Sequence, residues 1–262
     1  MYTQENFPMK KTLLLSCILG AVGFAFLGFN KNEKLEEIKI DEGFVFVQLF
    51  TSQGCSSCPP ADKLLDKITE DNKDENIYTL SYHVDYWNRL GWKDPFSSKT
   101  FSDKQYEYSQ QFGSSTVYTP QAVINGQIHF TGSSSDKMDK ALKYYLKSDS
   151  PININITNIT SSDTKITANF NSEELPKNAY LLVALVVDSR NTSVKRGENV
   201  GKIIKNNNIV ATEKAASPGK KNGSLALEIP EWIELKDNLS LVAYIQNEDL
   251  KILGASKKKI ER

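Results

Sequence analysis

The chain is poor in the residues that build metal centres and disulfide frameworks. Its 262 residues include three cysteines and two histidines. Cys17 lies in an apolar N-terminal run, so the rest of the chain keeps only Cys55 and Cys58. A disulfide framework needs several separated cysteines, and a four-cysteine zinc site needs a second Cys-x-x-Cys motif, which is absent. One close cysteine pair therefore remains, and we predict no metal.

The chain also lacks a net charge. Lysine and arginine together number 32, as do aspartate and glutamate. This balance offers no overall attraction to nucleic acid, so we predict no nucleic-acid partner. With 39% hydrophobic and 24% charged residues, the chain has enough apolar side chains for a core. Nothing in the sequence specifies an oligomeric state.

The N-terminal 30 residues have the character of an export segment. Lys10 and Lys11 precede an apolar run over residues 13–29. This pattern is typical of a secretory signal, and its length also suits a retained membrane anchor. Either alternative places the protein outside the cytoplasm, in the periplasm or anchored to the outer face of the inner membrane. Residues 31–41 are charged and are expected to form a tether.

Residues 42–148 alternate between strand-like and helix-like patterns. The expected order is strand, helix, strand, helix, strand, strand, helix, over residues 44–50, 55–69, 77–84, 102–112, 117–125, 127–130 and 135–146. Pro59 and Pro60 fit only the first turn of a helix, which places the cysteine pair where a strand turns into a helix. We predict an α/β domain with a thioredoxin-like fold.

After Pro151 the pattern changes to short runs with period-two alternation. Seven such runs lie at residues 152–156, 165–170, 179–187, 209–212, 224–229, 239–246 and 251–254. Short strands separated by turn signals are typical of a β-sandwich. We therefore predict an all-β, sandwich-like domain over residues 149–262.

The Cys55-x-x-Cys58 motif is the strongest chemical signal. A helix N-terminus lowers the pKa of a nearby thiol, and the spacing brings both sulfurs within disulfide reach. The loop that this bond would close is too small to stabilise a large fold, so the pair is interpreted as reactive. We expect Cys55 to be the more exposed, attacking thiol and Cys58 the resolving thiol. The redox-active disulfide is then the only cofactor.

Thr119-Pro120 begins a strand-like run, and we predict a cis bond that turns the Thr119 backbone toward the cysteines. Thr119, Tyr118 and Trp87 are predicted to contact substrate. The aromatic cluster of Trp87 with Tyr86, Trp92 and Phe96 forms either a lip for a peptide or an aromatic minicore.

His83 has two interpretations: a proton acceptor for the thiols, or a core histidine oriented by Asp85. Asp62, one helical turn after Cys58, is interpreted as a solvated helix residue. Residues 196–199 form either a turn that locks the two domains together or a polar edge of the site.

Several motifs resemble one family. They lie at residues 49–62, 83–87, 91–96, 118–121 and 196–201. Together they resemble secreted bacterial proteins grouped as domain of unknown function 1223, within the thioredoxin-like superfamily, and the resemblance implies that fold. The family usually has an acid at the position of Gln48, as thioredoxins have near that place. Because glutamine cannot take a proton, base assistance from Gln48 is not expected.

Three functions fit these residues. The first is an exported thiol–disulfide oxidoreductase that acts on protein thiols or disulfides through Cys55, Cys58, Pro120 and His83. The second is a copper-binding protein or chaperone, since two thiolates and the His83 imidazole suit copper. The third is a non-catalytic binding module in which the cysteine pair is a resting disulfide.

Overall fold

The computed structural model describes residues 43–148, 151–217 and 219–261. The elements follow the order β1 (Val45–Thr51), α1 (Pro59–Asp71), β2 (Ile77–His83), the 3-10 helix η1 (Asn88–Leu90), α2 (Lys99–Gln111), β3 (Gln121–Ile124), β4 (Ile128–Thr131), α3 (Ser135–Tyr145), β5 (Ile154–Ser161), β6 (Lys165–Ser172), β7 (Ala179–Ser193), β8 (Ile203–Ala215), β9 (Asn222–Glu228), β10 (Leu239–Asn247) and β11 (Ile252–Lys259). The predicted export segment, residues 1–30, and tether, residues 31–41, lie outside the described residues. No helix in the described part of the chain is long and apolar enough to cross a membrane.

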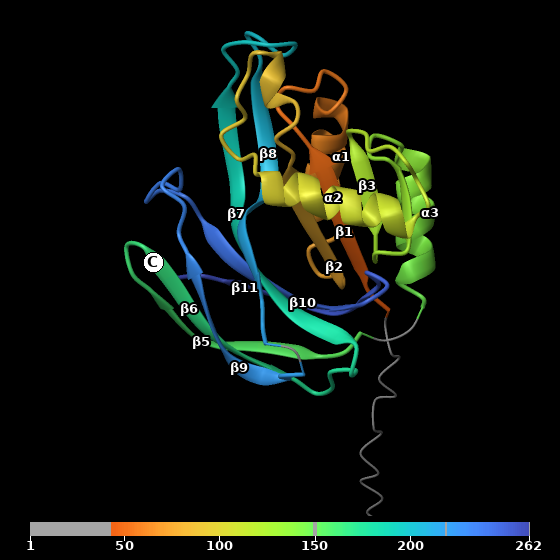
Figure 1. The fold of residues 1–262 in the computed structure, drawn as a ribbon, viewed down its shortest axis with the longest axis vertical. Helices are drawn as coiled ribbons and strands as arrows, with labels where there is room; N and C mark the ends of the chain where they lie inside the picture. The colour runs from red at the N-terminus through yellow and green to blue at the C-terminus, as the bar shows by residue number, and fades with distance from the viewer. Residues whose placement is uncertain (1–42, 149–150, 218, 262) are drawn as a thin grey trace, which may run out of the picture. The chain divides into compact units, whose positions relative to one another are not determined.

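Eight strands form one mixed sheet in the order β11-β10-β7-β8-β2-β1-β3-β4 (Figure 1). β1 and β2 run parallel, and β3 lies antiparallel to β1. On the other side of β2, β8 pairs in parallel through Ser81 and Ile209. The Ser81 hydroxyl strengthens this junction by donating to the Asn207 carbonyl at 2.9 Å. The sheet therefore continues without a break from the first half of the chain into the second.

The predicted fold class, a thioredoxin-like α/β domain followed by a separate β-sandwich, is wrong. The elements over residues 45–145 occur in the expected order, but their strands are only one part of a larger, mostly β structure. β7, β8, β10 and β11 extend the same sheet, and β5, β6 and β9 form a second sheet of three strands. Hydrophobic periodicity shows which faces of a strand are buried, but it does not show which strand pairs with each edge.

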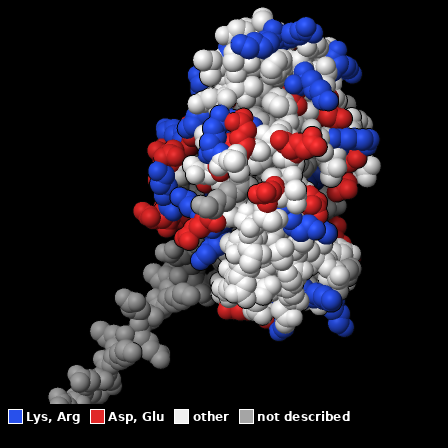
Figure 2. Space-filling model, turned by 90° about the vertical axis from the view of Figure 1, so that its left-hand side faces the viewer, with Lys and Arg blue, Asp and Glu red and all other residues white. Residues whose placement is uncertain are grey.

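The helices and the small sheet cover different parts of the large sheet. α1 and α3 pack on one face of β1 through the buried residues Val45, Val47, Leu49, Leu65, Ile68, Met138 and Leu142. α2 packs on the opposite face, where Phe101 and Tyr108 contact a second core cluster. The small sheet buries β5, β6 and β9 side chains against β7 and β10. Basic and acidic side chains mix over the middle of the face drawn in Figure 2.

A partly buried ion pair also joins the two halves. Glu213 of β8 accepts from Lys104 of α2 at 2.7 Å, from Tyr82 of β2 at 2.7 Å and from Tyr244 of β10 at 2.6 Å. Burial alone would raise the pKa of Glu213, but the Lys104 charge and these hydrogen bonds lower it overall. The carboxylate is thus held in its charged form between four elements.

We expect the full chain to unfold in denaturant in one transition, because β8 pairs with strands of both halves. A Trp232→Phe variant leaves Trp87 and Trp92 as reporters of the first half, and a Trp87→Phe/Trp92→Phe variant leaves Trp232 as reporter of the second. In each variant, the midpoint from tryptophan fluorescence should coincide with the midpoint from far-ultraviolet circular dichroism. Two separated midpoints in either variant would contradict a shared sheet.

Candidate functional site

The two cysteines lie where the chain leaves β1 and begins α1, and they are joined by a disulfide. Their Cα atoms are 5.4 Å apart. Cys58 is the N-cap of α1, and Pro59 and Pro60 occupy its first turn, as the sequence predicts. Cys55 and Cys58 are both 0% exposed, so the expectation that Cys55 is the more exposed thiol is wrong for the oxidised state. The neighbouring Ser56 and Ser57 reach solvent.

The predicted substrate-contacting residues divide into two groups. The Thr119–Pro120 bond is cis. The Ser57 hydroxyl lies 3.4 Å from Cys55 Sγ and donates to the Thr119 carbonyl at 3.5 Å. Trp87 Nε1 donates to the Thr119 hydroxyl at 2.7 Å, so Trp87 and Thr119 border the cysteine loop.

Tyr118 points elsewhere. Its hydroxyl lies 3.0 Å from His129 Nδ1, beside β4. Two other aromatic residues of the predicted cluster have different surroundings. Phe96 is buried against Trp232, whereas Trp92 donates a hydrogen bond to Gln53.

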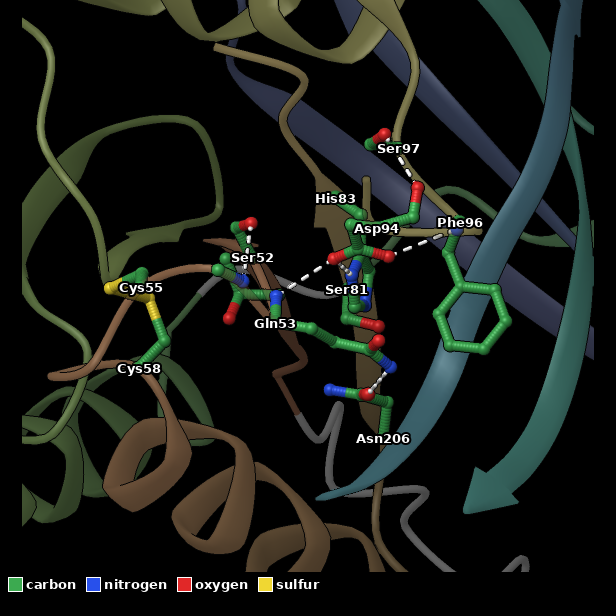
Figure 3. Close-up of polar contacts among 12 residues, drawn as sticks. Ser52, Gln53, Cys55, Cys58, Ser81, His83, Asp94, Phe96, Ser97 and Asn206 are labelled. Atoms are coloured by element: carbon green, nitrogen blue, oxygen red, sulfur yellow. Dashed lines mark hydrogen bonds and ion pairs between the residues drawn. A yellow bond between two sulfur atoms is a disulfide. The ribbon is translucent and has the colours of Figure 1, made fainter. Parts of the chain in front are cut away.

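Gln53 anchors the loop that carries the cysteines (Figure 3). Its backbone N–H donates to Asp94 Oδ2 at 2.8 Å, and its side-chain amide donates to Asn206 Oδ1 at 2.8 Å. Its side-chain oxygen accepts from Trp92 Nε1 at 3.2 Å, and its carbonyl accepts from Asn199 Nδ2 at 2.9 Å. Four hydrogen bonds from two stretches of the chain, residues 92–94 and 199–206, therefore fix the residue two positions before Cys55.

Asp94 connects that loop to His83. One Asp94 oxygen, Oδ2, accepts from Gln53 and lies 2.7 Å from His83 Nδ1, and the other accepts from the Phe96 N–H at 3.0 Å (Figure 3). Burial alone would lower the pKa of His83, but the Asp94 charge and hydrogen bond hold it above its usual value. The residue that orients His83 is thus Asp94 rather than Asp85, which instead accepts from the Ser102 hydroxyl.

Asp62 is buried beneath the cysteine pair instead of being solvated. It is 3% exposed, its backbone N–H donates to the Cys58 carbonyl at 3.1 Å, and Thr51 donates to its carboxyl at 3.0 Å. Burial raises the pKa of Asp62 from 3.8 to about 7, although the His83 charge and the Thr51 hydrogen bond act in the opposite direction. Asp62 Oδ2 and His83 Nε2 have no hydrogen-bond partner among the described residues. This interior can therefore gain a proton without breaking an existing hydrogen bond.

A loop from the second half of the chain bonds to the backbone of the loop that carries the cysteines. Between β7 and β8, Asn199 is 0% exposed and donates to the carbonyls of Gln53 and Cys55, the latter at 2.8 Å. The neighbouring Glu198 accepts from the Ser56 N–H at 3.0 Å, and this contact lowers the pKa of Glu198. Residues 196–199 therefore border the site and also connect the two halves.

The structure brings Cys55, Cys58, Thr119 and Trp87 together. His83 does not contact the sulfurs in this arrangement but pairs with Asp94, which in turn bonds to the cysteine loop through Gln53. Sequence reasoning missed three buried polar residues, Gln53, Asp94 and Asn206, and its interpretation of the buried Asp62 as solvated is wrong. Asn199 lies in the predicted polar segment over residues 196–199. Gln53, Asp94 and Asn199 lie inside the family-like motifs, whereas Asn206 has no motif to mark it. Gln48 is buried on the α2 side, where it accepts from Tyr108. In the described part of the chain, no three His, Cys, Asp or Glu side chains are grouped to hold a metal ion.

An Asp62→Asn variant should gain stability over the wild type as the pH rises. The folded protein keeps the Asp62 proton up to about pH 7, whereas the unfolded chain loses it near pH 4, so the wild type loses stability between these values. Asparagine carries no charge, and the free energy of unfolding at pH 8 should favour the variant by up to about 4 kcal/mol. Denaturant titrations at pH 5, 6, 7 and 8 measure the difference.

Asp66→Asn is the matched control, because Asp66 lies on the same helix, reaches solvent and pairs with Lys205. A stability difference between Asp62→Asn and the wild type that is the same at pH 5 and pH 8 would show that Asp62 does not hold a proton.

The structure is similar to that of a solved protein, nearly all of which it matches. A crystal structure of a protein from Agrobacterium tumefaciens is 26% identical, has a TM-score of 0.58, and the alignment covers 84% of this chain and 99% of that one. A DUF3823 family protein from Bacteroides ovatus is 15% identical over 41% of this chain and 52% of that one, with a TM-score of 0.27. Comparison with curated proteins gives no match. The family model described as "protein of unknown function (DUF1223)" matches residues 46–246, and the chain therefore belongs to that family.

Proposed function

We propose that this protein exchanges thiols and disulfides through Cys55 and Cys58. The observation that carries the proposal is the disulfide at the start of α1, in a loop held by buried hydrogen bonds. A bond between residues three apart removes little entropy from the unfolded chain, so stabilising the fold is a poor reason for it. A rigidly held, strand-to-helix cysteine pair suits repeated opening and closing of the bond.

Each turnover moves two electrons and two protons. A thiolate of a protein dithiol attacks one sulfur of the Cys55–Cys58 disulfide and forms a mixed disulfide, which releases the other cysteine as a thiolate. The second thiol of the partner then attacks the mixed disulfide. The partner leaves with a disulfide, and both cysteines of this protein are left reduced. In the opposite direction, the same steps reduce a partner disulfide.

The surroundings of the pair support this chemistry. The Ser57 hydroxyl, 3.4 Å from Cys55 Sγ, is placed to donate to a Cys55 thiolate, and the start of α1 adds its positive dipole end. Asp62, whose pKa burial raises to about 7, offers a carboxyl within one helical turn of Cys58 that can take or give a proton near neutral pH. The His83–Asp94 pair lies behind this carboxyl and holds a second proton.

We place this activity outside the cytoplasm, on protein thiols or disulfides. The support is the basic, apolar segment over residues 10–29, which has the composition of an export signal or anchor. An oxidising compartment is where a protein disulfide persists.

The reduction potential of the pair is the direct test. Protein equilibrated in glutathione or dithiothreitol buffers is expected to interconvert reversibly, with a potential between about −120 and −270 mV, the range of dedicated exchange catalysts. Alkylation of free thiols followed by mass spectrometry measures the reduced fraction. Cys55→Ser is the control for background thiol reactivity. A potential below about −300 mV, typical of structural disulfides, would overturn the proposal.

A further inference from the structure

The surface around the disulfide is rich in cations, although the whole chain has no net charge. Two segments form it: residues 87–93, which follow β2, and residues 194–203, which comprise the β7–β8 loop and the first residue of β8. We call their five exposed cations the basic rim: Arg89, Lys93, Lys195, Arg196 and Lys202. Figure 2 shows Lys and Arg side chains at the upper end of the molecule, where Figure 1 places the β7–β8 loop.

The two segments lie side by side and reach the cysteine loop. A Cβ atom on Gly197 would lie 3.2 Å from the Cβ atom of Trp92, so the segments are in close contact. The β7–β8 loop then bonds the cysteine loop through Asn199 to Cys55 and through Glu198 to Ser56. The basic rim is therefore next to the disulfide.

The charge of the rim is not compensated within it. Glu198 is the only acidic residue of the two segments, and its carboxylate already accepts from the Ser56 N–H. Asp94, which follows the first segment, is buried. Among ion pairs between described side chains, none involves a cation of the rim. These positive charges are thus available to a partner.

Exposed apolar side chains lie on the same two segments. Leu90 is 46% exposed, Val200 61% and Ile203 75%. Apolar side chains beside unpaired cations suit a partner that supplies acidic groups at the edge of the contact and apolar groups at its centre.

We propose that the basic rim, with Leu90, Val200 and Ile203, docks an acidic segment of the partner protein whose cysteines exchange with Cys55 and Cys58. This inference rests on the proposed function and names its substrate class. Opposite charges steer a partner toward the disulfide and raise the association rate, an effect that salt weakens. The apolar contacts then hold the partner thiol near the sulfurs long enough for attack.

Two model dithiol peptides of equal length test the proposal, one with glutamates and one with lysines flanking the cysteines. Reduction of the Cys55–Cys58 disulfide in the full chain is followed by quenching with an alkylating reagent and mass spectrometry. At low salt, the acidic peptide is expected to react at least about tenfold faster, and the ratio should approach one near about 0.5 M salt.

The rim variant Lys93→Gln/Lys195→Gln/Arg196→Gln should remove most of the preference for the acidic peptide. Its matched control, Lys143→Gln/Lys177→Gln/Lys220→Gln, removes three exposed lysines of α3 and of the segments that precede β7 and follow β8, and should keep the preference. Circular dichroism confirms that each variant is folded.

The remaining outcomes separate the two proposals. Equal rates with both peptides at low salt, in a protein that does react, overturn the docking surface alone. No reaction with either peptide overturns the exchange function as well. Equal rates together with rim-dependent binding to phosphatidylglycerol vesicles would assign the surface to an anionic membrane and also overturn the docking proposal.

Discussion

The buried carboxylate of Asp94 is the contact on which the geometry of the cysteine loop depends. A buried carboxylate is costly unless donors surround it, and here the N–H groups of Gln53 and Phe96 and the His83 ring meet it. Because Gln53 is two residues from Cys55 and His83 ends β2, this one side chain ties the cysteine loop to the sheet. Its donors come from three segments, so the loop can take its position only when all three are folded.

The site is a product of the whole sheet rather than of one half of the chain. The first half supplies the cysteines, Asp62 and His83, and the second supplies Asn199 and Asn206, which bond Gln53 from the far side. β8 brings these residues into place, because it pairs with β2 and starts where the β7–β8 loop ends. The long strand β7 therefore carries its loop to the cysteines, although the two segments are more than 100 residues apart in the sequence.

The sequence predicts local features well and long-range ones poorly. Every predicted strand and helix has a counterpart, the cysteines lie at the predicted turn and Thr119–Pro120 is cis, because each of these follows from a short pattern. The pairing of β2 with β8 could not be predicted, because residues 209–212 have the same alternating pattern as the six other predicted strands of the second half. The burial of Asp62 could have been inferred from its place between Ala61 and Leu65 on the apolar stripe of its helix. Asn206 is the first of three consecutive asparagines, and nothing in that run shows which one faces Gln53.

The position of β8 also limits how this protein can evolve. A strand in the middle of a sheet cannot be lost or exchanged without leaving the facing edge of β7, and Ser81 of β2, without their partners. Recombination that joined the first half of this chain to a foreign second half would expose the edge of β2 and remove Asn199 from the cysteine loop. We therefore expect the two halves to be inherited together, with variation in length confined to the hairpin ends and surface loops.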